Sequence, residues 1–281
     1  MLDLEFAELS DAGLSRGHNE DFVGHVIPSS PAQAQSQGWL FALADGVGGQ
    51  EMGEVASRLA VETVLNGFRK IPKGIMHVSL LPRLVQEANQ AVFDMGNTGH
   101  NQQLRDYVDP GGAILPRGVQ MATTLVLCAL RFDSAVVSHV GDSRCYQLRK
   151  GHLASLTHDH TLVDEQLRRG LITREDAETH IHRHMLTRSL GGEMFVAADT
   201  ITVNIMPGDV LLLCSDGLHG YVPDPAIEWM LNSTPDLTEA AATLVAAANA
   251  AGGHDNVSVQ LVRIKTVERM GLYRGRPYRL L

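Results

Sequence analysis

The sequence predicts an α+β fold in which antiparallel sheets carry helices on their outer faces. Three observations predict this class. Segments with strand character are concentrated toward the two ends of the 281-residue chain. At most two helical segments follow each group of strands, so the regular strand–helix alternation that builds a parallel sheet is missing. No segment repeats at a fixed period, which argues against a repeat architecture.

Three strands are predicted in the N-terminal part of the chain. Residues 2–9 alternate apolar and polar side chains, which is the period of a half-buried strand. Residues 21–27 and 39–44 are two further apolar segments with strand character. The residues between them, 28–38, are rich in proline, serine and glutamine and predict a loop.

Two helices are predicted next. Apolar residues recur near helical spacing over residues 52–68, and a second helical segment covers residues 80–95. Residues 96–118 then read as a loop, which is unusually long for a compact domain and looks extended relative to an ordinary core.

The middle of the chain returns to strands. Residues 122–132, 134–141 and 144–151 are predicted strands, and the last two are predicted to form a hairpin. Residues 156–192 are polar and rich in histidine and arginine, so we expect this segment to lie outside the core. Short helical patterns occur inside it, at residues 164–171 and 174–180.

The C-terminal part completes the predicted elements. Residues 199–205 and 210–215 are predicted to be a strand pair joined by a Pro-Gly-Asp turn. Residues 237–252 have the composition and period of a helix, and residues 256–264 form the last predicted strand. Residues 265–281 hold five basic residues and one glutamate. This tail is expected to be a solvated extension, with a docking segment for an acidic partner as the alternative.

Composition excludes several classes of protein. The net charge of −9 argues against a general nucleic-acid or membrane-surface binder and is compatible with gathered carboxylates that bind cations. No apolar stretch approaches the roughly 20 residues that span a bilayer, and the acidic N-terminus does not resemble a signal peptide. Cys128, Cys145 and Cys214 lie in or beside apolar segments and are expected to be buried free thiols. We therefore expect a cytoplasmic protein.

Four aspartates lie at the edges of apolar strand segments. Asp45 ends one segment and precedes Gly46, Asp142 and Asp216 follow two others, and Asp255 precedes the last strand. Strand ends are rigid, and functional sites are often built in the loops beyond them. Any one of these aspartates, seen alone, is more often a turn residue. Four together predict a site for hard cations such as Mg²⁺, Mn²⁺ or Ca²⁺, because clustered carboxylates must be neutralised.

A short glycine-bearing loop, "GLSRGHNEDF", precedes the second predicted strand. It contains Arg16, Asn19, Glu20 and Asp21. The planar guanidinium of arginine matches the geometry of a phosphate group. An exposed arginine on a turn is the ordinary alternative.

These motifs and several others occur in a recognisable order. The chain resembles the metal-dependent PP2C-type serine/threonine phosphatases, the PPM family, in their bacterial form. The resemblance runs from about residue 4 to residue 264, and eight motifs in register carry it: "GLSRGHNEDF", "ALADGVGGQEMGEVAS", "ATTLVL", "HVGDSRCYQLRKG", "LTHDHTLVDEQLRRG", "LTRSLGG", "DVLLLCSDGLHGYV" and "GGHDNVSVQLV".

The resemblance implies a four-layer α-β-β-α sandwich, in which helices flank two antiparallel sheets. It implies a phosphatase domain over residues 1–264, with a flap subdomain at about residues 156–192 beside the active site. Residues 265–281 remain as a basic C-terminal tail.

The resemblance also implies a set of metal ligands. The residue matching Asp45 bridges two metals, and the one matching Gly46 gives a backbone carbonyl to one of them. The matches to Asp216 and Asp255 hold the second metal. Asp142, together with Asp216, matches the ligands of a third metal in bacterial members.

Further roles follow from the same resemblance. Arg16 matches the phosphate-binding arginine, and Asp21 matches an acidic residue that orients the attacking water. Glu20 and Asn256 are expected to support the residues around them. Val47 stands where some eukaryotic members carry a histidine that is a candidate general acid, so the group that protonates the leaving oxygen is left open.

The implied activity is hydrolysis of phosphoserine and phosphothreonine in proteins by a water or hydroxide that bridges two metals. Two to three Mn²⁺ or Mg²⁺ ions are the implied cofactors, and a bacterial serine/threonine kinase is the implied counterpart. No nucleic-acid or membrane partner is expected, and a monomer is the default. Two alternatives are a catalytically silent regulator that binds phosphoproteins and a hydrolase of small phosphate esters.

Overall fold

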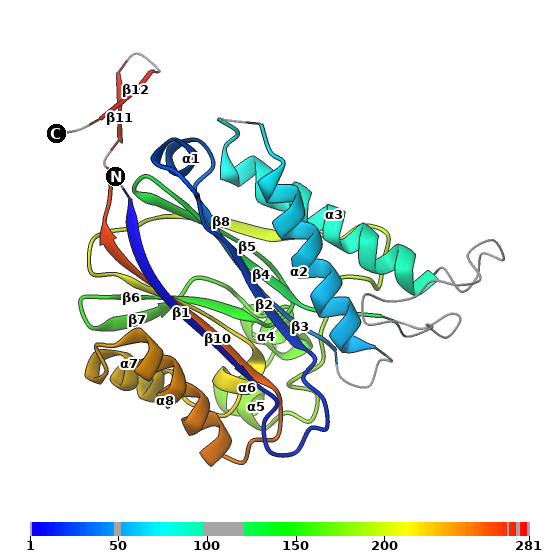
Figure 1. The fold of residues 1–281 in the computed structure, drawn as a ribbon. Helices are drawn as coiled ribbons and strands as arrows, with labels where there is room; N and C mark the ends of the chain where they lie inside the picture. The colour runs from blue at the N-terminus through cyan, green and yellow to red at the C-terminus, as the bar shows by residue number, and fades with distance from the viewer. Residues whose placement is uncertain are drawn as a thin grey trace.

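The structure is a computed structural model of the 281-residue chain. It describes residues 2–47, 52–72, 74–97, 121–268, 270–273 and 276–279. Two antiparallel sheets of five strands each lie face to face, and helices cover both outer faces (Figure 1). This arrangement confirms the predicted four-layer α+β sandwich.

The first sheet has the strand order β1-β10-β9-β6-β7. Its strands are β1 (Asp3–Asp11), β10 (Val257–Thr266), β9 (Val210–Cys214), β6 (Arg144–Arg149) and β7 (His152–Ser155). Helices α7 (Asp224–Ser233) and α8 (Leu237–Ala250) cover its outer face (Figure 1). Leu244 of α8 packs in one buried cluster with Leu212 and Leu261 of the sheet, which fixes this pair of layers.

The second sheet has the strand order β2-β3-β4-β5-β8. Its strands are β2 (Asp21–Val26), β3 (Trp39–Asp45), β4 (Leu125–Arg131), β5 (Ser134–Val140) and β8 (Asp199–Asn204). Helices α2 (Gly53–Arg69) and α3 (His77–Asn97) cover its outer face (Figure 1). β3 and β4 are apolar along almost their whole length because both of their faces are buried.

The core between the sheets is built from side chains of both. Phe41, Leu43 and Val126 of the second sheet pack in one fully buried cluster with Leu213 and Val262 of the first. Burial of apolar side chains on this scale is the main source of stability for a sandwich. It also holds the strand ends of the two sheets in fixed positions relative to each other.

Smaller elements lie at the edges of the sandwich. They are α1 (Pro31–Ser36), α4 (Leu162–Arg168), α5 (Arg174–Thr179), α6 (Asp216–His219), β11 (Met270–Tyr273) and β12 (Arg276–Arg279). The helices α4 and α5 form the segment predicted to lie outside the core. β11 and β12 pair as an antiparallel hairpin that projects from the sandwich, where a simple extension was expected (Figure 1).

Two predicted strand pairs are wrong. Residues 134–141 and 144–151 do not form a hairpin, because β5 lies in the second sheet and β6 in the first. Residues 199–205 and 210–215 are likewise split, since β8 pairs with β5 and β9 pairs with β10 and β6. At both places the short connection carries the chain from one sheet across to the other. Turn residues predict a reversal of direction, and they do not reveal which sheet receives the next strand.

The predicted loop over residues 28–38 is wrong at its centre, where α1 forms. Ser30 caps this helix by accepting a hydrogen bond from the backbone N–H of Gln33, and Pro31 follows in the first turn, where proline is tolerated. Helix α7 had not been predicted. In the predicted loop 96–118, α3 extends to Asn97, and the remainder lies outside the described residues.

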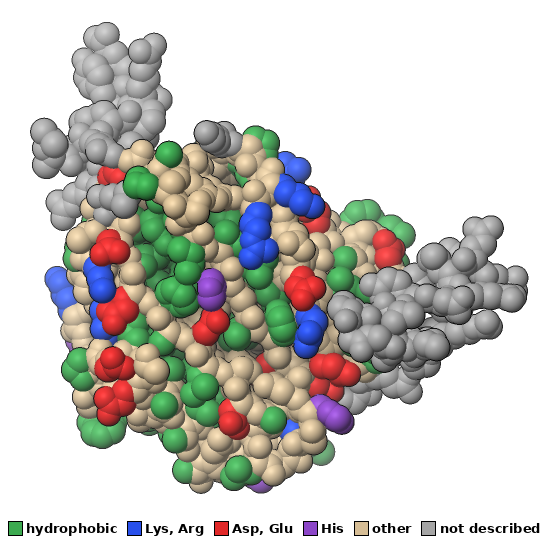
Figure 2. Space-filling view, in the orientation of Figure 1, with side chains coloured by type: hydrophobic (Ala, Val, Ile, Leu, Met, Phe, Trp, Pro, Cys, Tyr) green, Lys and Arg blue, Asp and Glu red, His purple; other side chains and the backbone are tan. Residues whose placement is uncertain are grey.

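The three cysteines are buried free thiols, as predicted. Within the part of the chain that the structure describes, no helix has the length and apolar character needed to cross a bilayer. Figure 2 shows acidic and basic side chains interspersed over the face that carries β1 and α2. Glu5 of β1 illustrates this mixing, because it lies opposite Arg263 of β10 and forms an ion pair with it at 3.4 Å.

Candidate active site

Strand ends from both sheets meet around one cavity of about 340 Å³. Asp45 ends β3, and Asp142 follows β5 in the same sheet. Asp216 follows β9, and Asp255 precedes β10 in the other sheet. The predicted site residues that line the cavity are Arg16, Asp45, Gly46, Asp142, Asp216 and Asp255. The structure therefore brings together residues that lie far apart in the sequence.

The backbone around Asp45 is held by the neighbouring strand. Its N–H donates to Thr124 Oγ1 at 3.0 Å, and its carbonyl oxygen accepts from Thr124 N–H at 2.8 Å. Gly46 N–H donates to the Glu20 carbonyl oxygen at 3.1 Å. A Cβ atom on Gly46 would lie 2.4 Å from the carbonyl oxygen of Gly53, so only glycine allows the start of α2 to approach this closely.

Asp21 lies behind the cavity lining. It is the register partner of Asp45 across β2 and β3, and its side chain is buried. Oδ2 accepts a hydrogen bond from Ser215 Oγ at 2.7 Å, whereas Oδ1 has no hydrogen-bond partner among the described residues. Burial is the main cause that raises the pKa of Asp21 to about 7, and the charges of Asp216 and Asp255 act in the same direction.

Three of the aspartates that line the cavity also have raised pKa values. Burial raises the pKa of Asp45 well above its usual range, and repulsion from Asp21 adds to it. Burial and the charge of Asp216 raise the pKa of Asp142, and burial and Asp255 raise that of Asp216. Divalent cations would relieve this repulsion, and the all-oxygen donor set suits Mg²⁺ or Mn²⁺. The unpartnered Oδ1 of Asp21 also fits a site that needs a further ligand or water.

Arg16 reaches the cavity from the loop after β1. Its Nη2 donates to Asp255 Oδ2 at 2.9 Å, and its side chain is 42% exposed. The guanidinium therefore contacts the same carboxylate that the resemblance assigns to a metal. A cation on Asp255 would compete with this ion pair and leave the donors of Arg16 for another anion.

Asn256 organises the loop that carries Arg16. Its Oδ1 accepts from Glu20 N–H at 2.8 Å, and its Nδ2 donates to the carbonyl oxygens of Ala12 and His18, both at 2.9 Å. Its own N–H donates to Asp255 Oδ1 at 2.9 Å. Glu20 contributes through its backbone, because its N–H and carbonyl oxygen are bonded to Asn256 and Gly46.

Several residues that line the cavity had not been singled out from the sequence. They are Thr124, His184, Leu186, Tyr221 and His254, whereas Val47 had been named as the position of a histidine in some eukaryotic members. His184 Nδ1 lies 3.7 Å from Asp216 Oδ2. The sequence showed that residues 156–192 are rich in histidine, but it did not indicate which histidine lies at the cavity. Tyr221 is brought to the cavity only by the tertiary fold, and no pattern in the sequence indicated it. A second cavity of about 520 Å³ adjoins this one and shares Asp142 and His184 with it.

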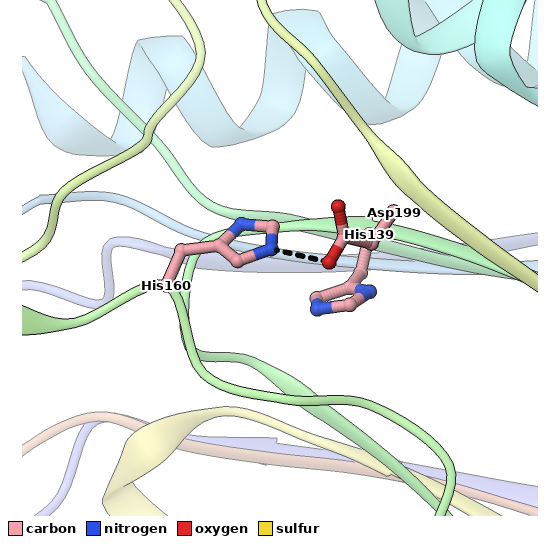
Figure 3. A group of neighbouring side chains, drawn as sticks. All are labelled: His139, His160 and Asp199. Carbon is pink, nitrogen blue, oxygen red and sulfur yellow. Dashed lines mark ion pairs between the residues drawn. The ribbon is translucent and has the colours of Figure 1, made fainter. Parts of the chain in front are cut away.

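A separate group of possible ligand atoms lies behind Asp142. His139, His160 and Asp199 point toward one another from β5, the start of the flap and β8 (Figure 3). His160 Nδ1 accepts a hydrogen bond from Gly141 N–H at 3.1 Å, so the proton of the neutral ring lies on Nε2, which faces Asp199. Arg188 already pairs with Asp199 at 2.9 Å. A protonated Nε2 and a neighbouring guanidinium both oppose a cation here.

Comparison with known proteins relates the whole arrangement to one family. A family model described as protein phosphatase 2C matches residues 18–262. The chain is 35% identical over 263 residues to the serine/threonine phosphatase stp of Listeria innocua, a match that covers 92% of this chain and 96% of that protein.

Solved structures give the same result. The Mycobacterium tuberculosis serine/threonine phosphatase PstP/Ppp is similar with a TM-score of 0.77 and 32% identity, over 94% of this chain and 100% of that one. The catalytic domain of PstP in complex with two manganese ions is similar with a TM-score of 0.75 and 31% identity, again over 94% and 100%.

Proposed function

The chain belongs to the protein phosphatase 2C family and is a metal-dependent protein serine/threonine phosphatase, and we propose that the cavity between the two sheets is its active site. One observation carries this assignment. Carboxylates from both sheets, with raised pKa values, line a single cavity that Arg16 also enters. Such a cavity suits divalent cations and a phosphoryl group, and the substrate is a phosphorylated protein.

The enzyme uses Mn²⁺ or Mg²⁺. We assign Asp45, the Gly46 carbonyl, Asp216 and Asp255 to two of these ions, and Asp142 with Asp216 to a third. When bound, the ions lower the pKa of a shared water molecule and neutralise charge on the phosphoryl oxygens. Ligands drawn from both sheets fit this role, because the sandwich core holds their strands in place.

The other residues act on the substrate and on protons. Arg16 would bind two oxygens of the phosphoryl group with its planar fork of donors, on a loop that Asn256 holds. Asp21 would orient the attacking water and hold its proton at Oδ1, the oxygen without a partner. Its pKa is about 7 in the absence of cations, and bound divalent cations would lower this pKa, which favours the proton-accepting form at neutral pH. Val47 has no proton to give, so the leaving oxygen must be protonated by another group.

The wider setting follows from the activity. A protein phosphatase requires a kinase that makes its substrate, and we propose a cognate serine/threonine kinase as its counterpart. We further propose a cytoplasmic monomer whose catalytic unit spans residues 1–264, with residues 156–192 as a flap and residues 265–281 as an appended tail. Analytical ultracentrifugation at micromolar concentration tests the monomer directly.

The assignment of the site is tested by phosphate release from a phosphothreonine peptide, with and without Mn²⁺. We expect Mn²⁺-dependent turnover by the wild type and a loss of at least about a hundredfold in Asp216→Asn, because the substitution removes a charged ligand. Asp3→Asn, at an exposed position of β1, serves as the matched control and should keep full activity.

Two results would overturn parts of this proposal. An inactive wild type that is folded and loaded with Mn²⁺ would leave a silent phosphoprotein-binding regulator. A wild type that hydrolyses small phosphate esters but no phosphopeptide or phosphoprotein would leave the metal site intact and change the substrate class.

A further inference from the structure

We propose that His160 and His219 are positioning residues that hold the backbone of Gly141 and Asp142, so that the Asp142 carboxylate is presented to a cation. The inference rests on the proposed function, because it takes Asp142 as a metal ligand. His160 is buried and His219 is half-buried, and neither needs to touch the substrate. Their contribution is to fix one ligand that follows a strand end instead of lying within a strand.

The backbone conformation of the turn at Gly141 is tightly restricted. Its φ of +101° favours glycine, and a Cβ atom there would lie 2.6 Å from the Thr124 side chain. His160 satisfies both backbone groups of this residue. Gly141 N–H donates to His160 Nδ1 at 3.1 Å, and the Gly141 carbonyl oxygen accepts from His160 N–H at 3.0 Å.

The His160 ring is itself fixed on every side. Its Nε2–H faces Asp199 Oδ2 at 3.3 Å (Figure 3). Arg188 Nη1 donates to Asp199 Oδ1 at 2.9 Å. His139 stacks on the ring with centroids 4.6 Å apart. The side chain is 2% exposed. These contacts hold one tautomer and one orientation, which keeps the acceptor Nδ1 aimed at Gly141.

His219 holds the next residue from the opposite side. Its Nε2–H donates to the Asp142 carbonyl oxygen at 2.9 Å. His219 ends α6, the helix that begins at Asp216, so this bond joins the two residues assigned to the third cation. The bonds from His160 and His219 reach only the backbone of Gly141 and Asp142, and they leave the Asp142 carboxylate available for a cation.

His160 accepts its hydrogen bond at Nδ1, whereas His219 donates from Nε2. Substitutions that imitate one ring nitrogen or the other can therefore test the proposal. An Asn amide places its oxygen near the position of Nδ1, whereas a Gln amide places its nitrogen near the position of Nε2. His160→Asn keeps the acceptor for Gly141, and His160→Gln removes it. At residue 219 the pattern reverses, because His219→Gln keeps the donor for Asp142 and His219→Asn removes it.

The measurement is Mn²⁺ binding to the full chain by isothermal titration calorimetry, supported by electron paramagnetic resonance of free Mn²⁺. We expect His160→Gln and His219→Asn to weaken the weakest Mn²⁺ site about tenfold, the effect of one buried group left unpaired. His160→Asn and His219→Gln should stay within about threefold of the wild type. The exposed His158→Asn is the control, and thermal unfolding confirms that each variant is folded.

General destabilisation cannot explain opposite effects of Asn and Gln at residues 160 and 219. It would depend on the size of the new side chain and would weaken all Mn²⁺ sites together. Equal effects of Asn and Gln at both positions would overturn the proposal. A wild type that binds only two Mn²⁺ ions would overturn it too. In that case phosphate release from a phosphopeptide would still test the proposed function independently.

Discussion

The Arg16 guanidinium lines the cavity and also pairs with the Asp255 carboxylate. A change of side chain at residue 16 therefore alters both sets of contacts. The arginine fork can bond one carboxylate or two phosphoryl oxygens, whereas lysine presents a single point charge. The loop that carries it is fixed through Asn256, so a change at residue 16 should alter contacts to the phosphoryl group without moving the loop.

We predict that Arg16→Lys lowers kcat/KM for a phosphothreonine peptide by about tenfold to a hundredfold, which is the loss of one or two charge-assisted hydrogen bonds. The affinity for Mn²⁺ should stay equal or increase, because a competitor for Asp255 is weakened. Steady-state kinetics and a Mn²⁺ titration measure the two quantities. Arg149→Lys, whose partner Asp209 lies outside the cavity, is the control. An unchanged kcat/KM in Arg16→Lys would remove Arg16 from the phosphate site.

His77 gives a prediction about stability at low pH. It is buried at the start of α3, its Nε2–H donates to the Gln37 carbonyl oxygen at 2.7 Å, and burial lowers its pKa to about 4. Between pH 4 and 6.5 the unfolded chain binds a proton at this residue that the folded chain does not bind. The stability that neutral His77 permits is therefore present above pH 6.5 and is lost as the pH falls toward 4.

We expect His77→Gln, which retains an N–H donor, to lose about 1–3 kcal/mol less stability than the wild type between pH 7 and 4.5. Urea denaturation at the two pH values measures this difference. His152→Gln, an exposed position in β7, should follow the wild-type curve. Parallel curves for the wild type and His77→Gln would show that His77 does not titrate in this window.

At the scale of elements, the flap differs from the strands in how little apolar surface it buries. Within α4 and α5, Val163 is the one buried apolar side chain among the described residues. Leu171, Ile181 and Met185 are exposed. Hydrogen bonds to the sandwich secure the two ends of the flap. His160 N–H donates to the Gly141 carbonyl oxygen at 3.0 Å, and Leu190 N–H donates to the Thr123 carbonyl oxygen at 2.8 Å.

We predict that amides in residues 162–186 exchange with deuterium faster than those of β3 and β4, because opening the flap exposes little apolar surface. Hydrogen exchange followed by mass spectrometry resolves the two regions within one sample. Protection of the flap equal to that of the strands would show that it opens only when the whole domain unfolds.

At the scale of the whole molecule, the proposed cation site draws its residues from both sheets. Asp45 and Asp142 belong to one sheet, and Asp216 and Asp255 to the other. Their repulsion opposes the packing that the apolar core favours. Bound cations turn the same residues into a connection between the sheets, so metal binding and folding are linked.

We predict that a Mn²⁺ concentration of a hundred times the Kd at pH 7 stabilises the protein by about 2.7 kcal/mol at that pH, and that the gain at this fixed concentration grows between pH 5 and 8. The pKa of Asp21, about 7, lies above the value near 3.9 of an unfolded aspartate. Without Mn²⁺, the stability that its protonation permits is therefore lost as the pH rises through 7. Thermal unfolding with and without Mn²⁺ across this range tests both statements. In Asp45→Asn the gain should be much smaller, and an undiminished gain would locate the cation elsewhere.

The sequence predicted that four aspartates gather at one site because each lies at the edge of an apolar strand, and all four line the cavity. Sequence-based prediction was wrong or silent where the structure depends on tertiary contacts. The connection from β5 to β6 has the residues of a turn, and only the packed sheets show that it crosses between layers. His160 and Thr124 act through atoms that reach Gly141 and Asp45 from distant strands and loops, and their spacing along the chain carries no trace of this.

β1 is an edge strand whose hydrogen-bonded partner is β10, and the contact between Arg16 and Asp255 joins residues 239 positions apart. During synthesis on the ribosome, the first strand must therefore wait for almost the last one. Asp45 and Asp142 can take their places earlier, because β2 to β5 precede β6 to β10 in the chain. A nascent chain would thus hold part of the proposed cation site before Arg16, the proposed phosphate-binding residue, reaches its position. The enzyme becomes competent only when translation of the domain is nearly complete.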